Sequence, residues 1–307
     1  MRVFHHLRDF PFLQQPIILT IGNFDGVHCG HQYILKAMSK DLFSPTQTCV
    51  ITFNNHPSEV LNPFSPTPLI CSLAHKINLL KEAHIDNLLL LTFDTELAQQ
   101  TAENFIQEIR SYIPFSRLIL GYDATLGKNR QGDKSKMKQL AKQYNFDIDY
   151  TEEYCHQENP ISSTLIRKYL QEGKLSEVEQ LLGRPYSIYS TIGRGANKGK
   201  LIGFPTANLN VANLCLPPYG VYKVTLKHNK NCFAGIANLG LAPTLKNSKT
   251  PILEAHLFSF SDDLYDKEVE VIFHEFIRPE KKFSSIEELR IQIKKDIEKL
   301  KEFRTVM

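Results

Sequence analysis

A short apolar run that ends in a glycine-rich turn limits the possible folds of this chain more than any other segment. Residues 17–21 read Ile-Ile-Leu-Thr-Ile, which is typical of a strand buried on both faces of a parallel sheet. Residues 22–31 follow directly and read Gly-Asn-Phe-Asp-Gly-Val-His-Cys-Gly-His. Apolar residues at helical spacing begin at Ile34. The sequence therefore predicts a strand, a tight turn and a helix that carries two histidines at its start.

The first half of the chain alternates between strand-like and helix-like segments. Residues 50–53, 88–93 and 118–120 are strand-like, and residues 102–109 have apolar side chains at helical spacing. Alternation of this kind predicts a parallel sheet flanked by helices. Because such sheets bind ligands at the carboxyl ends of their strands, we expect a site at the turn that follows residue 21.

The second half has a different pattern, with short strands joined by turn-rich connections. Five or more such strands with few helices predict a small antiparallel barrel. A last helix is expected to begin at Ser284, where Glu287 completes a capping box. The expected strands cover residues 186–192, 220–226, 232–238, 252–258 and 268–276.

The boundary between the halves is expected after a pair of helices. Ser162 and Ser163 cap the first helix, and Ser176 with Glu179 starts the second as a capping box. Residues 183–185, Gly-Arg-Pro, break the second helix. A length of 307 residues also fits two domains. We therefore expect one domain over residues 1–182 and another over residues 183–307.

The charge balance and the cysteines limit the classes of function. Lys and Arg number 36 and Asp and Glu 33, so the net charge is +3, which argues against a nucleic-acid or membrane-surface binder. No apolar run approaches the roughly 20 residues of a membrane span, and no signal peptide is visible. The six cysteines form no CxxC pair and are expected to be buried, reduced thiols. We expect a cytoplasmic enzyme, a monomer or weak homo-oligomer, with small-molecule substrates and no nucleic-acid or membrane partner.

The turn at residues 22–31 is the first candidate site. Its glycines let a ligand approach the backbone, and the start of a helix offers unpaired N–H groups to phosphate. His28 and His31 are three residues apart, so they share one face of the helix and can donate hydrogen bonds to phosphate oxygens. A metal site made by the two histidines with Asp25 is the alternative.

Two further segments fit a phosphate site. His56 and Pro57 follow the second strand, at the edge where ligands are expected. Residues 161–167, Ile-Ser-Ser-Thr-Leu-Ile-Arg, place three hydroxyls at the start of a helix and Arg167 one turn further on. An ordinary N-cap explains part of this pattern. Adenylyl transfer at such a site needs only positioning and charge stabilisation around an in-line displacement at an α-phosphate, usually with Mg²⁺.

The second candidate site lies in the expected barrel. Residues 193–200 form a glycine- and lysine-rich loop that can fold over phosphates, or else a basic solvated hairpin. Thr206 and Asn208 are two residues apart, so on an extended chain their oxygens point the same way and suit Mg²⁺ with nucleotide phosphates. Alternation along residues 252–258 puts Glu254 on the polar face, where it is a candidate general base for attack on a γ-phosphate.

Together these motifs resemble one family. GNFDGVHCGH, NHP, ISST, GFPTAN, YGVY, GIANLG, PT and EAHLF occur in this order over nearly the whole chain. The chain thereby resembles the bacterial bifunctional riboflavin kinase/FMN adenylyltransferases, also called FAD synthetases. The resemblance implies an α/β nucleotidyltransferase domain with a Rossmann-like parallel sheet, followed by a small antiparallel β-barrel riboflavin kinase domain with a C-terminal helix. It also implies phosphorylation of riboflavin to FMN by Mg²⁺–ATP, and then adenylylation of FMN by ATP to FAD with release of pyrophosphate.

The resemblance also implies roles for single residues. His28 and His31 would be catalytic in adenylyl transfer, and Glu254 would accept the proton of riboflavin's terminal hydroxyl in the kinase. Thr206 and Asn208 would bind Mg²⁺. The residues expected to bind ATP for adenylyl transfer are Gly22, Asn23, Phe24, Asp25, Gly30, His56, Pro57, Asp123, Ser162, Ser163, Thr164 and Arg167. Those expected to bind ATP in the kinase are Gly199, Lys200, Gly203, Pro205, Thr206 and Asn208, and Tyr222 and Arg278 are expected to bind flavin.

One stretch and two single positions depart from the family's pattern. Residues 124–126 are Ala-Thr-Leu where the family has an aromatic and basic stretch, Leu165 follows ISST in place of an arginine, and Ala242 replaces an arginine before the Pro-Thr pair. The loss of a cation weakens phosphate contacts. The alternative is therefore a riboflavin kinase with a weakened or degraded adenylyltransferase domain. A relative of the aminoacyl-tRNA synthetases and a non-catalytic flavin sensor or carrier are two further hypotheses.

Overall fold

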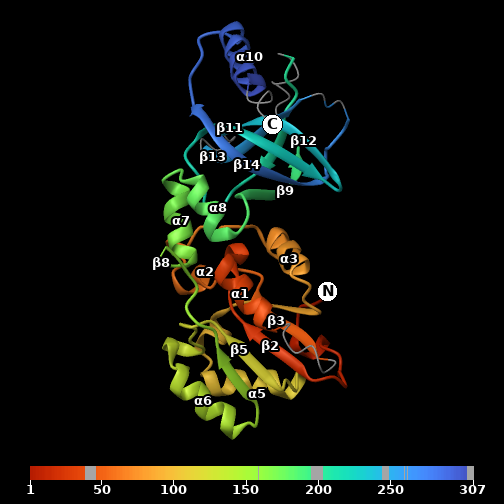
Figure 1. Ribbon diagram of the computed structural model, residues 1–307, viewed down its shortest axis with the longest axis vertical. Helices are drawn as coiled ribbons and strands as arrows, with labels where there is room; N and C mark the ends of the chain where they lie inside the picture. The colour runs from red at the N-terminus through yellow and green to blue at the C-terminus, as the bar shows by residue number, and fades with distance from the viewer. Residues whose placement is uncertain are drawn as a thin grey trace. The chain divides into compact units, whose positions relative to one another are not determined.

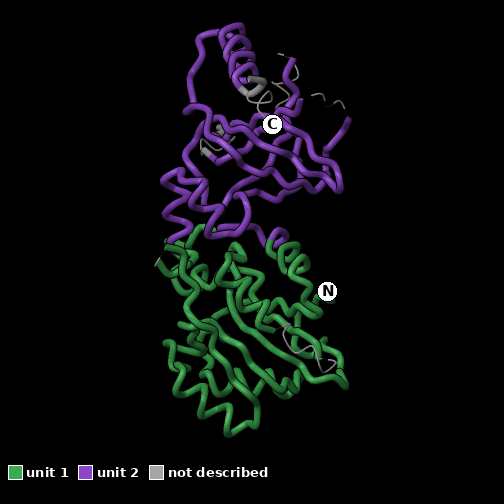
Figure 2. The backbone as a smooth tube through the Cα atoms, viewed as in Figure 1, with its two compact units in different colours: residues 1–69, 76–163 green, residues 70–75, 164–307 purple. Residues whose placement is uncertain are grey.

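The chain divides into two compact units. The computed structural model describes residues 1–38, 46–157, 159–194, 203–243, 249–258, 260 and 262–302. One unit contains residues 1–69 and 76–163, and the other contains residues 70–75 and 164–307 (Figure 2). This division follows backbone contacts, and the expected domain boundary after residue 182 stays a prediction.

The first unit is built on a six-stranded sheet in which each neighbouring pair is parallel, as predicted (Figure 1). Every residue of β2 is buried, which explains its continuous apolar run. The strand order reverses between β2 and β5, and this switch point is where open α/β sheets bind ligands. In spatial order the strands are β1 (Arg2–Phe4), β4 (Asn87–Leu91), β3 (Gln47–Phe53), β2 (Ile17–Ile21), β5 (Arg117–Leu120) and β6 (Asp147–Tyr150).

Helices α5 and α6 cover one face of this sheet, where Ile17, Leu19 and Ile21 belong to the same apolar core as the buried side of α5. Gly127 has a φ of +74°, and a Cβ there would overlap the backbone nitrogen of Ala102, so only glycine fits beside the start of α5. The helical segments of this part of the chain are η1 (Leu7–Asp9), η2 (Asp25–Val27), α1 (Cys29–Met38), α2 (Ser58–Leu61), α3 (Leu73–Glu82), α4 (Thr95–Gln99), α5 (Ala102–Tyr112), η3 (Lys128–Arg130) and α6 (Lys134–Gln143). A small antiparallel pair, β7 (Cys155–His156) and β8 (Asn159–Pro160), precedes α7 (Ser163–Gln171) and α8 (Leu175–Leu182).

The second unit contains a closed antiparallel barrel, which confirms the predicted architecture. Leu209, Leu239, Leu253 and Val271 are fully buried in it. Five of its strands coincide with the predicted ones, whereas β10 was expected only as extended chain. Around the barrel the strands are β10 (Ala207–Asn210), β13 (Lys249–Leu257), β12 (Asn231–Pro243), β11 (Gly220–His228), β14 (Glu268–Pro279) and β9 (Ser187–Gly193).

The closing helix, α10 (Ile286–Glu302), has its capping box one residue later than predicted. The Glu288 N–H donates to Ser285 Oγ at 3.1 Å, and the Glu288 carboxylate accepts from the Ser284 N–H at 3.0 Å. The predicted box from Ser284 to Glu287 was therefore wrong by one position. The predicted cap at Ser176 was also wrong, because α8 begins at Leu175 and Lys174 precedes it without a side-chain cap.

The cysteines were expected to be buried and reduced, and no segment was expected to span a membrane. None of the six cysteines is in a disulfide, and Cys49, Cys71 and Cys215 are buried, but Cys155 and Cys232 are exposed. Among the helices that the structure describes, none combines the length and the apolar content needed to cross a membrane.

Glu270 on β14 is a carboxylate whose ionisation stabilises the barrel unit. The His75 imidazole lies 3.6 Å from it and the Ser187 hydroxyl donates to it at 2.7 Å. These two contacts, with the Lys227 charge, lower the pKa of Glu270 from 4.5 to about 2. Because the folded pKa lies below the unfolded one, the stabilisation is present above about pH 4.5 and is lost as the pH falls toward 2.

We therefore expect Glu270→Gln to weaken the dependence of the barrel's unfolding free energy on pH in the acid range. Between about pH 6 and pH 3 the native protein should lose about 2 kcal/mol more unfolding free energy than the variant. Urea unfolding followed by circular dichroism at the two pH values measures this difference. Equal losses in the two proteins would contradict the assignment.

Candidate active sites

The turn after β2 has an unusual backbone conformation. The Gly22 N–H donates to the Ile51 carbonyl at 3.1 Å, which ties the end of β2 to β3. Phe24, Gly26 and Val27 then all have positive φ angles, of 51°, 77° and 41°. Such conformations cost free energy in residues other than glycine and cluster at ligand sites. The turn delivers the chain to the start of α1 at the switch point of the sheet.

His28 and His31 form a stacked pair at this helix start. Their ring centroids are 3.6 Å apart, and the His31 N–H donates to His28 Nδ1 at 3.3 Å, so the His28 ring caps the first turn of α1. A Cβ on Gly30 would lie 3.2 Å from the His28 ring, so glycine gives the ring room. Nδ1 of His31 is buried and has no hydrogen-bond partner among the described residues.

The electrostatics keep His31 neutral. Burial lowers the pKa of His31 well below its usual value, and the nearby His28 and Lys76 lower it further. A neutral imidazole retains one N–H donor and one acceptor nitrogen. A buried ring nitrogen without a partner, at the start of a ten-residue helix, is suited to an anionic ligand that would satisfy it.

The structure brings the predicted ISST segment to this turn. The Ser163 hydroxyl donates to the Asp25 carbonyl at 3.3 Å, and Asp25 itself is buried. Asn23 is held by β3, because its carbonyl accepts the Thr52 hydroxyl at 2.9 Å. Gly22, Phe24 and Ser162 are chain neighbours of these residues. Thr164 and Arg167 group with the second unit, so their part in this site stays a prediction.

His56 and Pro57 shape the segment that follows β3. His56 Nδ1 hydrogen-bonds with the Ser58 hydroxyl at 2.7 Å, and Pro57 is the N-cap residue of α2. The backbone N–H of His56 also donates to the Glu59 carboxylate at 2.9 Å. These contacts order the loop at the sheet edge, and ATP binding by His56 and Pro57 stays a prediction.

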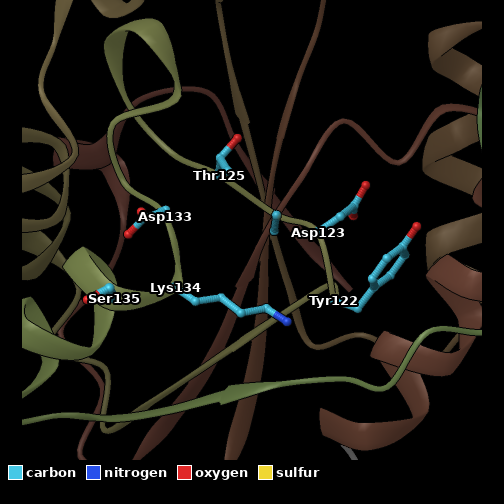
Figure 3. A pocket seen from close by; sticks show the side chains of 7 residues that line it. Tyr122, Asp123, Thr125, Asp133, Lys134 and Ser135 are labelled. Carbon is cyan, nitrogen blue, oxygen red and sulfur yellow. The ribbon is translucent and has the colours of Figure 1, made fainter.

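A pocket of about 420 Å³ opens beyond β5, the strand next to β2 (Figure 3). Lys134, from the start of α6, extends toward Tyr122 in this view and lies 5.1 Å from the Tyr150 ring. The Tyr150 hydroxyl is buried and has no partner within the described residues. Of the predicted site residues, Asp123 lines this pocket. Its lining is Tyr122, Asp123, Ala124, Thr125, Asp133, Lys134 and Ser135.

Sequence reasoning missed the α6 side of this pocket. Residues 124–126 depart from the family's pattern, and Ala124 and Thr125 line the opposite side. Asp133 caps α6 by accepting the Lys136 N–H at 2.9 Å, and this cap places Lys134 and Ser135 at the pocket. An aspartate ahead of a lysine-rich helical segment was the available signal.

In the barrel, three polar residues face one another across three strands. Glu254 on β13 lies directly opposite Asn208 on β10 and directly opposite Asn238 on β12. Side chains opposed in this way share one face of the sheet, with Cβ atoms about 5 Å apart. The structure therefore brings together Asn208 and Glu254, two of the residues predicted for the kinase site. Asn238 was missed as a site residue, although it lies in the quoted GIANLG motif.

The GFPTAN segment is held against the same strand as Glu254. His256 Nδ1 hydrogen-bonds with the Pro205 carbonyl at 2.9 Å, and the Phe204 ring meets the His256 ring edge-on at 5.2 Å. Asn208 Nδ2 donates to the Thr206 carbonyl at 3.3 Å. Gly203 has a φ of +84°, a conformation that favours glycine. The predicted ATP contacts at Gly199 and Lys200 lie outside the described residues.

Tyr222 and Arg278 have clear structural partners. Tyr222 is 1% exposed, packs against the Phe273 and Phe276 rings, and donates its hydroxyl to the Pro218 carbonyl. Burial raises the pKa of Tyr222. These contacts make Tyr222 part of the barrel core, and its role in flavin binding stays a prediction.

The Arg278 guanidinium forms an ion pair with Asp296 of α10, which is 1% exposed. Arg278 Nε lies 2.9 Å from the nearer carboxylate oxygen, and the Gln292 amide donates to the same carboxylate at 2.8 Å. The pair therefore anchors the C-terminal helix to the last barrel strand. Flavin binding by Arg278 likewise stays a prediction.

We expect Arg278→Met to lower the unfolding free energy of the barrel by about 3 kcal/mol, because it leaves the buried Asp296 carboxylate without its cation. Urea unfolding followed by circular dichroism measures the loss. The double variant Arg278→Met/Asp296→Leu is the matched control and should recover most of the stability. A single variant within about 1 kcal/mol of the native protein would contradict the role of the pair as an anchor.

Within the described ranges, no group of three or more His, Cys, Asp or Glu side chains is arranged to hold a metal ion. Thr206 and Asn208 instead offer hard oxygen atoms, which suit Mg²⁺ that is shared with nucleotide phosphates.

Two family models divide this chain between them. One, described as FAD synthetase, matches residues 11–165, and the other, described as riboflavin kinase, matches residues 182–304. The parallel sheet, with its glycine-rich turn at residues 22–31, falls in the first match, and the barrel falls in the second. Together they define a two-domain enzyme that converts flavins.

Similar proteins agree over the full length. The chain is 36% identical to a bifunctional riboflavin kinase/FMN adenylyltransferase of Haemophilus influenzae over 99% of both chains. It is 34% identical to that of Escherichia coli K12, over 99% of this chain and 97% of the relative. A crystal structure described as a macrolide-efflux protein from Streptococcus pneumoniae superposes with a TM-score of 0.81 at 27% identity, covering 96% of this chain and 97% of that one.

This chain belongs to the family of bifunctional riboflavin kinase/FMN adenylyltransferases. The predicted family, fold class and enzyme class are confirmed. Because both domains are present, the bifunctional reading is favoured over the kinase-only alternative. The same matches disfavour a synthetase relative or a flavin carrier.

Proposed function

We propose that the barrel phosphorylates riboflavin to FMN and that the parallel-sheet domain then joins FMN to the AMP moiety of ATP. The products of the second step are FAD and pyrophosphate. The observation that carries this proposal is the presence, in one chain, of both family domains. The pairing of Asn208 with Glu254 and the stacked His28 and His31 rings support it.

In the kinase step, Glu254 accepts the proton of riboflavin's terminal ribityl hydroxyl while the oxygen attacks the γ-phosphorus of ATP. The bond between the ribityl oxygen and the γ-phosphorus forms, which gives FMN. The bond from the γ-phosphorus to the bridging oxygen breaks, and ADP leaves with its electron pair. Support comes from the position of Glu254 between Asn208 and Asn238. Gly199, Lys200, Gly203 and Pro205 would contact the phosphates of ATP. Bound Mg²⁺, held by Thr206 and Asn208 oxygens, would neutralise phosphate charge.

In the adenylyl step, a phosphate oxygen of FMN attacks the α-phosphorus of ATP in line, and pyrophosphate leaves with the electron pair of the broken bond. His28 and His31 hydrogen-bond to the leaving phosphates at the start of α1 and stabilise their growing charge. The unpartnered Nδ1 of His31 supports this role. No covalent enzyme intermediate is required.

The acceptor FMN is proposed to occupy the pocket beyond β5. The pocket lies at the strand adjacent to β2, so it opens at the same carboxyl edge as the histidine turn. Its volume of about 420 Å³ suits a flat tricyclic ring, and Tyr122 and Lys134 offer an aromatic face and a cation.

The test is a product assay with purified protein, riboflavin and Mg²⁺–ATP, followed by chromatography with flavin fluorescence. FMN should form first and FAD should follow, with one pyrophosphate per FAD. FMN without FAD would reject the adenylyltransferase half of the proposal, and absence of both products would reject all of it. Omission of Mg²⁺ should stop both steps.

A further inference from the structure

Lys76, on α3, is a buried lysine whose contacts converge on the first site. Its side chain is buried, although lysine is seldom found in the interior. The ammonium donates to the Phe53 carbonyl at 2.8 Å, the Asn23 carbonyl at 3.1 Å and the Thr52 hydroxyl at 3.3 Å. These acceptors provide one partner for each of its three hydrogens.

The three acceptors belong to two neighbouring strand ends. Thr52 and Phe53 are the last two residues of β3, and Asn23 lies in the turn that follows β2. The Thr52 hydroxyl also donates to the Asn23 carbonyl, so ammonium, hydroxyl and carbonyl form a closed triangle. Lys76 thus fixes the backbone of the turn that leads to His28 and His31.

Burying an ammonium requires compensation, and an apolar side chain on α3 would pack here without that cost. The charge, however, acts on the site. After the larger effect of burial, the interactions with His28 and Lys76 each lower the pKa of His31 further. A fixed cation in a region poor in water interacts strongly with a nearby polyphosphate. One side chain therefore both holds the turn and contributes charge where the phosphates of ATP are expected.

We propose that Lys76 is a positioning residue for adenylyl transfer, which ties the turn at residues 22–31 to the end of β3 through three hydrogen bonds from its ammonium group. This inference rests on the proposed function of the first site. It is separate from the kinase, whose candidate residues lie in the barrel.

The test compares Lys76→Met and Lys76→Gln with the native full-length protein. Both variants lose the charge, but glutamine keeps a donor for the carbonyls and so protects the fold. We expect FAD formation from supplied FMN to fall about tenfold or more, mainly in kcat, while FMN formation from riboflavin stays within about twofold. Removing a positive charge must raise the pKa of His31, so its imidazole should titrate at a higher pH by nuclear magnetic resonance of ¹³C-histidine-labelled protein.

Thr52→Val is the comparison variant, because it removes the hydroxyl that bonds both Lys76 and the Asn23 carbonyl and leaves the lysine with its two backbone acceptors. Its His31 should titrate as in the native protein, and its FAD formation should fall less than that of Lys76→Gln. The inference is overturned if Lys76→Gln makes FAD at close to the native rate, or if His31 titrates unchanged in it. Native protein that makes no FAD from FMN would instead reject the proposed function of the site.

Discussion

Glu254→Gln is expected to stop the formation of FMN from riboflavin while supplied FMN is still converted to FAD. Glutamine fills the same space between Asn208 and Asn238 but cannot accept the proton of the attacking hydroxyl. Loss of a general base typically costs about 10²- to 10⁴-fold in rate. The effect is confined to one reaction, because the carboxylate lies in the barrel.

Two assays on one preparation measure this result, one starting from riboflavin and the other from FMN. Glu268→Gln is the matched control, since it neutralises a carboxylate of the same barrel at an exposed position of β14 and should leave both rates within about twofold. Parallel loss of both activities in Glu254→Gln, or a kinase rate above about a tenth of the native rate, would contradict the assignment of Glu254 as the base.

The complementary result is expected for the histidine pair. His31→Ala should lower FAD formation from FMN by about 10²- to 10³-fold, because it removes a donor aimed at the departing phosphates. His28→Ala should cause a similar loss and should also destabilise the start of α1, because His28 Nδ1 accepts the His31 N–H there. FMN formation from riboflavin should be unaffected in both.

Pyrophosphate release with supplied FMN measures the loss, and the riboflavin assay serves as the internal reference. Cys29→Ala is the matched control, because Cys29 lies between the two histidines at the start of the same helix. It should stay within about threefold of the native rate. A His31→Ala variant that makes FAD as fast as Cys29→Ala would remove His31 from the mechanism.

The sequence predicted the elements whose local pattern and tertiary environment agree. The run 17–21 is apolar at every position because β2 is covered on both faces, and the barrel strands alternate because only one face is buried. Strand β10 escaped prediction because Ala-Asn-Leu-Asn has little intrinsic strand preference, and its pairing with β9 and β13 makes it a strand. The capping box of α10 slipped by one residue because 284–285 are both serine and 287–288 both glutamate.

The candidate sites divide along the same line. The sequence motifs identified four candidate residues, because residue type and spacing indicate their chemistry. These are His28, His31, Asn208 and Glu254. Lys76 could not be found in this way, because a lysine in a helical segment is usually a solvated side chain and its burial depends on strand ends some 20 and 50 residues away in the chain. The α6 side of the pocket differs, because its Asp133 cap is a local feature that the sequence already carried.

The row of Asn208, Glu254 and Asn238 has a consequence for how the barrel is studied. The three residues come from three separate strands, and they become neighbours only when β13 pairs with both β10 and β12. Phosphorylation of riboflavin therefore reports on these two strand pairings. During refolding, kinase turnover should return only after both have formed, whatever the total content of β-structure.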